Sequence, residues 1–226
     1  MIKVCGITNS RDARAAAAAG ADLLGFIFYG RSPRFIKPVR AGEIIAQVRQ
    51  EWPAVAMVGV FVNESPARTA EIADACGLDL IQLHGGETPE IVQELGPRAF
   101  KALRPRDWTE AHELFELYRG VVEARSPALL LDAYHPSAFG GTGDRADWEI
   151  GREFARSLPI LLAGGLTAGN VAEAIQSVRP WGVDVSSGVE REPGIKDHDR
   201  LVQFVAAARN AFASIRAESR TTGGTI

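Results

Sequence analysis

Short apolar runs alternate with amphipathic segments along nearly the whole chain, and this alternation constrains the fold more than any other feature. Most of the runs contain Val or Ile, and each is followed by a segment with helical periodicity. The apolar runs cover residues 2–7, 21–28, 54–62, 78–84, 98–104, 128–134, 159–165 and 182–188. Strands that are apolar throughout are typical of a parallel sheet buried on both faces.

The intervening segments predict helices with recognisable ends. The predicted helices cover residues 10–19, 40–51, 65–76, 88–95, 107–119, 147–156, 169–178 and 197–216. Ser65 and Thr88 each precede a proline, which suits a helix N-cap followed by a first-turn proline. Gly20 follows an Ala-rich segment and suits the left-handed position just after a helix.

Eight strand–helix units in a chain of 226 residues predict an α/β fold, specifically a (β/α)8 TIM barrel. An open, doubly wound parallel sheet is the alternative, but such a sheet needs no eighth unit. No change in composition marks a second domain. We therefore expect one barrel domain over residues 1–216, followed by a flexible C-terminal tail over 217–226 that is polar and contains two glycines.

Composition excludes several classes of partner. The formal net charge is −3, and no dense run of Lys and Arg indicates a nucleic-acid surface. No apolar run approaches the ~20 residues of a membrane span, and no signal peptide is visible. Cys5 and Cys76 are the only cysteines and form no CxxC motif, so we expect neither a zinc site nor any other metal. These features predict a cytoplasmic protein.

In a (β/α)8 barrel, chemistry takes place at the C-terminal ends of the strands. Three glycine-rich stretches follow the sixth, seventh and eighth predicted strands, and they read FGGTGDRADW, LLAGGLTAGN and VDVSSGVE. Glycine lets backbone amides approach phosphate oxygens closely, and barrels often bind phosphate after strands seven and eight. We therefore predict a phosphate site here, although the same glycines could serve only tight turns.

Cys5 and Asp132 end the first and sixth predicted strands, so their side chains should face each other obliquely across the mouth of the barrel. A thiolate at Cys5 could act as a base or a nucleophile, whereas a buried thiol would be inert. Asp132 follows four apolar residues. It could be a proton donor with a raised pKa or a carboxylate that caps a loop, and the sequence does not decide between these roles.

Other charged residues lie on or near strand ends. Arg31 or Arg34, in the loop after the second strand, could bind a carboxylate. Lys101 in the fifth strand could form a Schiff base or serve as a structural charge. For His84 we expect a hydrogen-bonding role, and for Asp184 a place in a polar layer of the barrel.

Together these motifs resemble the phosphoribosylanthranilate isomerase family of tryptophan biosynthesis. The matching stretches run in order from residue 3 to about residue 199, and they include KVCGIT, FYGRSPRFI, VGVFVN, IQLHG, LLLDAY, GGTG, LLAGGL and GVDVSSGVEREPGIKD. The resemblance implies a (β/α)8 barrel and an Amadori rearrangement. In that reaction N-(5-phosphoribosyl)anthranilate becomes 1-(2-carboxyphenylamino)-1-deoxyribulose 5-phosphate without a cofactor.

The resemblance also implies roles for individual residues. The general base falls on Cys5, the general acid on Asp132, and the group that binds the substrate carboxylate on Arg34. His84 and Asp184 are expected as further substrate contacts. The expected phosphate site consists of Gly141, Thr142, Gly143, Gly164, Gly165, Ser186, Ser187 and Gly188. Relatives often carry Lys after GGTG, where this chain has Asp144 and Arg145.

Two other functions remain possible at this stage. One is an aldolase that uses Lys101 as a Schiff-base residue, and the other is a barrel that binds a phosphorylated ligand without catalysis. A binding protein would need neither Cys5 nor Asp132 at a strand end. The expected partner is the small phosphosugar–anthranilate substrate, with no nucleic acid or membrane, and the chain is expected to be a monomer or a homodimer.

Overall fold

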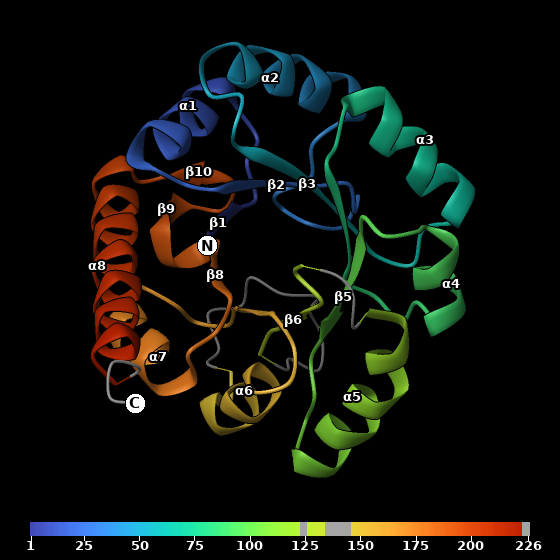
Figure 1. Cartoon of the computed structure of the whole chain (residues 1–226). Helices are drawn as coiled ribbons and strands as arrows, with labels where there is room; N and C mark the ends of the chain where they lie inside the picture. The colour runs from blue at the N-terminus through green and yellow to red at the C-terminus, as the bar shows by residue number, and fades with distance from the viewer. Residues whose placement is uncertain (123–125, 134–145, 223–226) are drawn as a thin grey trace.

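The computed structural model describes residues 1–122, 126–133 and 146–222. Eight parallel strands pair in chain order and close into a barrel, which confirms the predicted (β/α)8 fold (Figure 1). The pairing of β1 with β8 closes the barrel and sets Lys3 beside Asp184. The strands are β1 (Ile2–Cys5), β2 (Leu23–Ile27), β3 (Ala56–Phe61), β4 (Leu80–Leu83), β5 (Ala99–Leu103), β6 (Leu129–Leu131), β7 (Ile160–Leu162) and β8 (Gly182–Val185).

Helices form an outer ring around this barrel (Figure 1). They are α1 (Ser10–Ala19), α2 (Pro38–Glu51), α3 (Pro66–Cys76), α4 (Pro89–Glu94), α5 (Trp108–Val122), α6 (Trp148–Ala155), α7 (Val171–Val178) and α8 (His198–Thr222). Each lies within two residues of a predicted helix except at the C-terminal ends of α5 and α8. None of the described helices is long and apolar enough to span a membrane.

The local signals at helix ends were partly correct. Ser65 caps α3 by accepting a hydrogen bond from the Arg68 backbone N–H, and Gly20 ends α1 in the left-handed region with φ +99°. Thr88 precedes α4 as predicted, but its side chain makes no capping hydrogen bond. Its hydroxyl instead interacts with the Glu90 carboxylate, so the prediction of a side-chain cap at Thr88 was wrong.

The end of α8 differs from the prediction. The helix continues to Thr222, six residues beyond the predicted end at 216. Residues 217–222 contain neither glycine nor proline, so no residue in this segment breaks the helix before Gly223. The predicted helix end at residue 216 was therefore placed too early.

Three short elements between β8 and α8 were not predicted. A 3-10 turn, η1 (Ser187–Val189), is followed by β9 (Glu190–Glu192) and β10 (Ile195–Lys196), which pair antiparallel. We call the segment Glu190–Lys196 the β9–β10 hairpin. It lies near the end of β1 (Figure 1).

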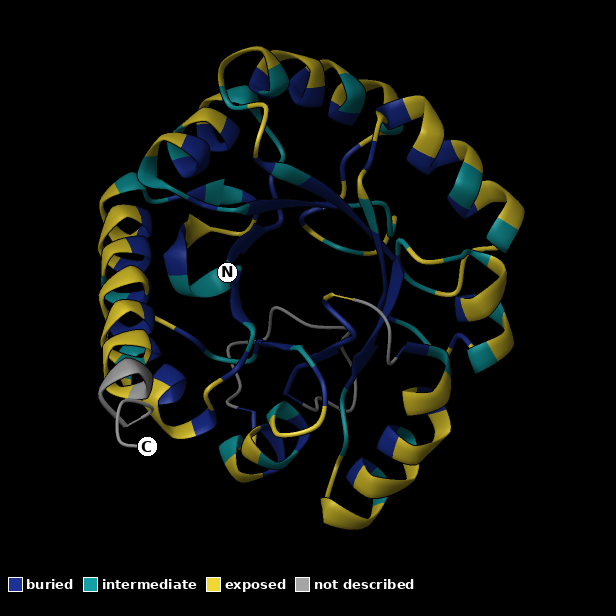
Figure 2. Ribbon diagram, in the orientation of Figure 1, coloured by how far each residue is buried: buried dark blue, intermediate teal, exposed yellow. Residues whose placement is uncertain are grey.

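Burial divides the barrel into two hydrophobic regions. The larger lies between the strands and the helices, whose inward faces are buried while their outer faces are exposed (Figure 2). The smaller fills the inside of the barrel and is formed by Leu23, Val58, Phe100, Ala102, Leu130, Leu161 and Ala163. Buried polar side chains, including Lys3, Gln82, Lys101 and Asp184, also come from the strands.

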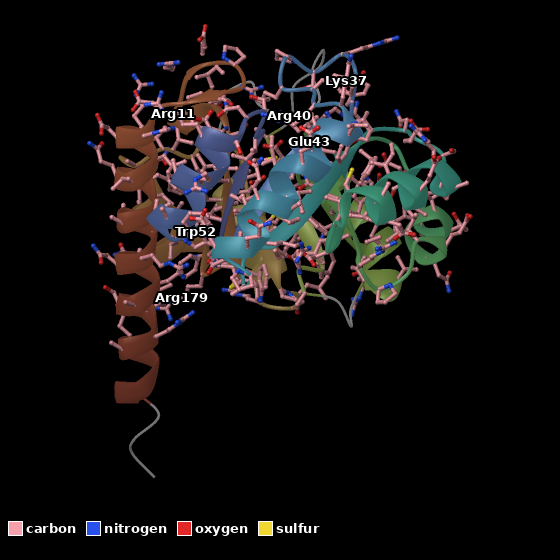
Figure 3. All side chains as sticks on the ribbon, turned by 90° about the horizontal axis from the view of Figure 1, so that it is seen from above. Arg11, Lys37, Arg40, Glu43, Trp52 and Arg179 are labelled. Carbon is pink, nitrogen blue, oxygen red and sulfur yellow. The ribbon has the colours of Figure 1, made fainter. Side chains whose placement is uncertain are left out.

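The helices run opposite to the strands, which fixes the face that carries the C-terminal strand ends. In the side view of Figure 3, Lys37 and Arg40 at the start of α2 lie at one end of the barrel. Trp52 and Arg179, which follow α2 and α7, lie toward the other end (Figure 3). The C-terminal strand ends therefore face the side of Lys37, where the site is expected.

Candidate active site

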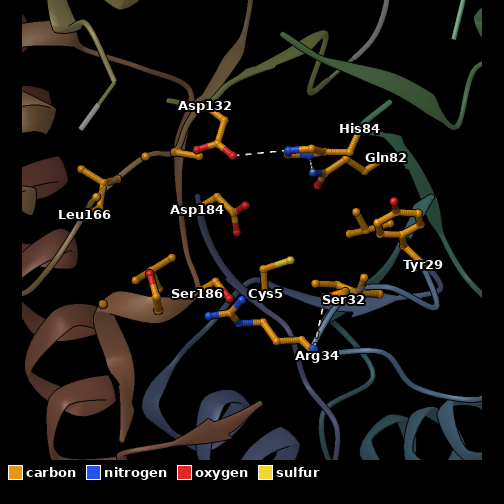
Figure 4. A pocket seen from close by; sticks show the side chains of 18 of the residues that line it. Cys5, Tyr29, Ser32, Arg34, Gln82, His84, Asp132, Leu166, Asp184 and Ser186 are labelled. Carbon is orange, nitrogen blue, oxygen red and sulfur yellow. Dashed lines mark hydrogen bonds and ion pairs between the residues drawn. The ribbon is translucent and has the colours of Figure 1, made fainter. Parts of the chain in front are cut away.

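One pocket opens at the C-terminal strand ends. Its lining comes from seven of the eight barrel strands or from the loops that follow them, and only β5 contributes nothing. It encloses about 760 Å³ not occupied by protein atoms, including its open mouth, which suits a small-molecule ligand. All the described residues predicted for the site line it (Figure 4). They are Cys5, Arg34, His84, Asp132, Gly164, Gly165, Asp184, Ser186, Ser187 and Gly188.

The remaining predicted residues, Gly141, Thr142 and Gly143, lie outside the described residues, as do Asp144 and Arg145. Sequence reasoning did not single out Gln82, Tyr29 or Ser32, which also line the pocket. Gln82 had a usable signal, because it lies two residues before His84 in a strand and therefore faces the same side of the sheet.

Cys5 is a free thiol at the end of β1, and its side chain points into the pocket (Figure 4). Lys3 lies two residues earlier on the same face of the strand and is fully buried. Its Nζ donates a hydrogen bond to Asp184 Oδ2 at 2.9 Å. Lys3 and Asp184 therefore form an ion pair with no net charge close to the thiol.

Burial raises the pKa of the Cys5 thiol above its ordinary value, and the nearby Asp184 carboxylate adds to this effect. The ammonium groups of Lys3 and Lys196 oppose it by favouring the thiolate. The pKa of Lys3 is itself raised, because attraction to Asp184 and Cys5 outweighs the burial that would lower it. The resting thiol is therefore protonated near neutral pH.

Asp132 lies across the pocket from Cys5 and is connected to His84 and Gln82 (Figure 4). Asp132 Oδ1 accepts a hydrogen bond from the Ala133 backbone N–H at 2.8 Å, and Oδ2 lies 3.3 Å from His84 Nε2. Gln82 Nε2 lies 2.7 Å from His84 Nδ1. With the Gln82 amide donating, a neutral His84 carries its proton on Nε2, which faces Asp132.

Arg34 comes from the loop after β2, and its guanidinium group extends below Cys5 toward Ser186 (Figure 4). Arg34 is 6% exposed, and its Nη2 lies 2.7 Å from Glu190 Oε2 in an ion pair. Arg34 was predicted to bind the carboxylate of the substrate. In the structure, the Glu190 carboxylate already binds some of the N–H donors of Arg34.

The loops after β7 and β8, where a phosphate site was predicted, are closely packed at their glycines. Gly164 has φ +82°, and a Cβ there would lie 2.8 Å from the Ala133 backbone nitrogen. A Cβ at Gly188 would overlap the carbonyl oxygen of Leu166. Gly188 therefore brings the loop after β8 against the loop after β7 at η1, and Gly164 brings the loop after β7 against residues that follow β6, which a tight turn alone does not require.

Four buried polar side-chain atoms on the pocket wall have no hydrogen-bond partner among the described residues. They are Gln82 Oε1, Asp184 Oδ1, Ser186 Oγ and His84 Nε2, and the last lies 3.3 Å from Asp132 Oδ2 without forming a hydrogen bond. Buried polar atoms are nearly always paired, because an unpaired one loses its hydration without compensation. Their concentration on one pocket indicates that a polar ligand binds there.

Lys101 does not line the pocket. Its Nζ donates hydrogen bonds to the carbonyl oxygens of Leu83, Gly85 and Ala102 and lies 3.2 Å from Glu87 Oε2. Burial lowers the pKa of this ammonium group, but its donors are directed at the backbone. The structure therefore gives the Schiff-base alternative no geometric support.

Metal ligation has no candidate in the part of the chain that the structure describes, where no group of three His, Cys, Asp or Glu side chains could hold an ion. Cys76 is also a free thiol, and it ends α3, where its Sγ donates to the Pro38 carbonyl oxygen at 3.2 Å. Cys76 takes no part in the pocket.

Comparison with known proteins identifies the family to which the chain belongs. The family profile described as N-(5'-phosphoribosyl)anthranilate (PRA) isomerase matches residues 2–207. The chain belongs to this family. The N-(5'-phosphoribosyl)anthranilate isomerase of Trichlorobacter lovleyi is 47% identical over 212 residues, which is 93% of this chain and 98% of that protein.

Solved structures of the isomerase family share the fold. The phosphoribosyl anthranilate isomerase of Thermotoga maritima has a TM-score of 0.82 and 37% identity, with 92% of this chain and 98% of that chain covered. A structure of a phosphoribosyl anthranilate isomerase in complex with reduced 1-(o-carboxyphenylamino)-1-deoxyribulose 5-phosphate has a TM-score of 0.79 and 36% identity, with the same coverage.

Proposed function

We propose that the chain catalyses the Amadori rearrangement of N-(5-phosphoribosyl)anthranilate in tryptophan biosynthesis, with Cys5 as general base and Asp132 as general acid. The observation that carries the proposal is the convergence of both side chains on one pocket, from β1 and from the end of β6. Membership in the isomerase family supports the reaction itself.

The first step opens the ribose ring. Asp132 donates its proton to the ring oxygen as the C1–O bond breaks, and the anilino nitrogen lone pair forms a C=N bond to C1. His84 Nε2 lies 3.3 Å from Asp132 Oδ2, so the imidazole ring is close enough to help orient the carboxyl group. The product of this step is a cationic Schiff base with an acidified C2–H bond.

The second step removes the C2 proton. The Cys5 thiol first loses its proton to solvent. The thiolate then takes the C2 proton, and the C–H electrons form a C1=C2 bond while the C=N electrons return to nitrogen. The resulting enolamine gains a proton at C1 and loses one from the C2 hydroxyl, which gives the ketone. Burial raises the pKa of the thiol, so the cationic charge of the Schiff base and the Lys3 ammonium group would favour the thiolate during this step.

Two anchors would hold the substrate for these transfers. The loops after β7 and β8, which meet at Gly188, would bind the phosphate, with the backbone N–H groups at the start of η1. Arg34 would bind the anthranilate carboxylate. His84 and Asp184 would contact the sugar through their unpaired polar atoms. Holding both ends of the substrate positions C2 near Cys5.

Turnover is tested by generating phosphoribosylanthranilate in situ and following the loss of its anthranilate fluorescence. The native chain should turn over, and Cys5→Ala and Asp132→Asn should each lose about 10² to 10⁴ in kcat/KM, the usual contribution of a proton-transfer group. Near-normal turnover of either variant would remove that residue from the chemistry. Binding without turnover by the native chain would instead favour the non-catalytic alternative.

A further inference from the structure

The β9–β10 hairpin places two charged side chains beneath the pocket. Glu190 and Lys196 are 6% and 3% exposed. Lys196 Nζ donates hydrogen bonds to Glu190 Oε1 at 2.8 Å, to the carbonyl oxygen of Cys5 at 2.5 Å and to that of Ser186 at 3.3 Å. Lys196 therefore ties the hairpin to the ends of β1 and β8, where the predicted base and phosphate site lie.

Glu190 binds only one edge of the Arg34 guanidinium group. Arg34 Nε lies 3.0 Å from each Glu190 carboxylate oxygen, and Nη2 lies 2.7 Å from Oε2. A guanidinium group has five N–H donors in a fixed plane, and these contacts use its Nε/Nη2 edge. The Nη1/Nη2 edge still offers two parallel donors, which is the geometry that binds a carboxylate bidentately.

Charge counting points to the same ligand. Arg34 and Lys196 each carry a positive charge and Glu190 a negative one, so the three buried side chains have one positive charge in excess. Hydrogen bonds from Arg34 and Lys196 lower the pKa of Glu190 despite its burial, so it remains ionised at neutral pH. No other carboxylate in the described part of the chain bonds to the side chain of Arg34 or Lys196. A buried excess charge is unfavourable until an anion binds.

We propose that Glu190 is a positioning residue, which turns the free edge of Arg34 toward a carboxylate on the aromatic ring of the substrate and so makes the enzyme prefer carboxylated arylamines. Lys196 fixes Glu190 in the position that this requires. The inference deepens the proposed function and rests on it, since it concerns how the same pocket selects its substrate.

Glu190→Gln distinguishes positioning from charge neutralisation, because the two roles predict changes in KM in opposite directions. If Glu190 only neutralised Arg34, its removal would leave more positive charge for the substrate, and KM would fall. If Glu190 positions Arg34, KM should rise roughly tenfold or more, the loss expected for one hydrogen bond to a charged group. In that case kcat should change much less, because contacts to the phosphate and ribose are retained.

Glu192→Gln is the matched control, because Glu192 lies on the same hairpin, is exposed and has the same side chain. It should leave KM and kcat unchanged.

A second substrate, N-(5-phosphoribosyl)aniline formed from aniline and ribose 5-phosphate, lacks the carboxylate. The ratio of kcat/KM for the two substrates does not depend on how much of a preparation is folded.

This ratio should fall roughly tenfold in Glu190→Gln, since one hydrogen bond to a charged group is lost, and it should stay at the native value in Glu192→Gln. In an Arg34→Met background, adding Glu190→Gln should lower the ratio no further, because the residue through which Glu190 acts is gone. If Glu190→Gln does not fold, Glu190→Asp should lower the same kcat/KM ratio, because the shorter side chain cannot reach both Nε and Nη2 of Arg34.

An unchanged ratio or a lower KM in the Glu190 variants would overturn the inference, as would additive losses with Arg34→Met. These results differ from failure of the proposed function, in which the native chain would convert neither substrate.

Discussion

Replacing Lys3 with Met removes one partner of a fully buried ion pair and shows how much the barrel depends on it. Lys3 has no exposed surface, and its Nζ lies 2.9 Å from Asp184 Oδ2. Asp184 Oδ1 has no hydrogen-bond partner among the described residues. Met matches the length and apolar character of the lysine stem, so the variant removes the charge with little change in packing.

The expected loss follows from the carboxylate that remains. Breaking a buried ion pair by removing one partner destabilises a protein by about 3–5 kcal/mol, since the other charge stays buried and uncompensated. With an unfolding entropy of about 2.1 cal/mol/K per residue, this loss should lower Tm of a chain of this length by roughly 6–11 °C. Asp184 opens onto the pocket, so the lower half of this range is expected.

Urea unfolding at pH 7 measures the free energy directly. The double variant Lys3→Met/Asp184→Leu removes both charges, and it should recover most of the loss because no isolated charge remains. Glu51→Gln is the control, because it breaks the exposed pair between Arg14 and Glu51 and should cost less than ~1 kcal/mol.

The pH dependence provides a second check with a defined sign. In Lys3→Met the isolated Asp184 carboxyl should favour its protonated form, so the loss of stability should shrink as pH falls from 7 to 5. In the native chain the pKa of Lys3 is raised above 10.5 by Asp184 and Cys5 in spite of burial. The stabilisation by the ammonium group is therefore complete below pH 10.5 and lost as pH rises through the folded pKa. A loss below ~1 kcal/mol at pH 7, or a double variant as unstable as the sum of the single changes, would refute this reasoning.

Three further results are expected. Burial raises the pKa of Cys5, so its alkylation by iodoacetamide should keep accelerating above pH 9, and a plateau below pH 8.5 would contradict this. Gly188→Ala forces a methyl group against the Leu166 carbonyl and should raise the inhibition constant of inorganic phosphate roughly tenfold or more; an unchanged constant would place the phosphate elsewhere. Asp12 is buried, but hydrogen bonds from the Lys196 backbone N–H and His198 outweigh burial and lower its pKa, so its stabilisation should persist above pH 4 and disappear as pH falls through the folded pKa. In urea unfolding, Asp12→Asn should cost about 1–3 kcal/mol at pH 7 and flatten this acid dependence, and an equally steep dependence would exclude Asp12 as its source.

The fold was predictable because its signals are local and repeated. Each barrel strand is an apolar run that must be buried on both faces, and each helix separates two such runs, so errors at one boundary do not change the topology. The β9–β10 hairpin gave no comparable signal. Its strands contain only three and two residues, and their sequences ERE and IK show no alternation of apolar and polar residues. Residues 217–222 were misread for a related reason, since polar composition was taken as the end of a helix that Ala, Glu and Arg can continue.

The site was predictable only as a set of residues. The rule that chemistry lies at the C-terminal strand ends, together with the family motifs, selected residues that do line one pocket. Their partners were not accessible, because the pairings of Lys3 with Asp184 and of Arg34 with Glu190 join positions 181 and 156 residues apart. Such pairings depend on how the barrel closes, and no short motif contains them.

The unfavourable features of this protein are concentrated where a ligand would relieve them. The buried pairs Lys3–Asp184 and Lys101–Glu87 are each neutral, and Lys101 also has three carbonyl partners. In contrast, the cluster of Arg34, Glu190 and Lys196 beneath the pocket keeps an excess positive charge, and four buried polar atoms on the pocket wall lack partners among the described residues. A barrel selected for stability alone would replace such groups with apolar side chains, which is often neutral or stabilising. Their retention on this one wall fits the proposed binding of an anionic, hydroxyl-bearing ligand better than a role in the stability of the fold.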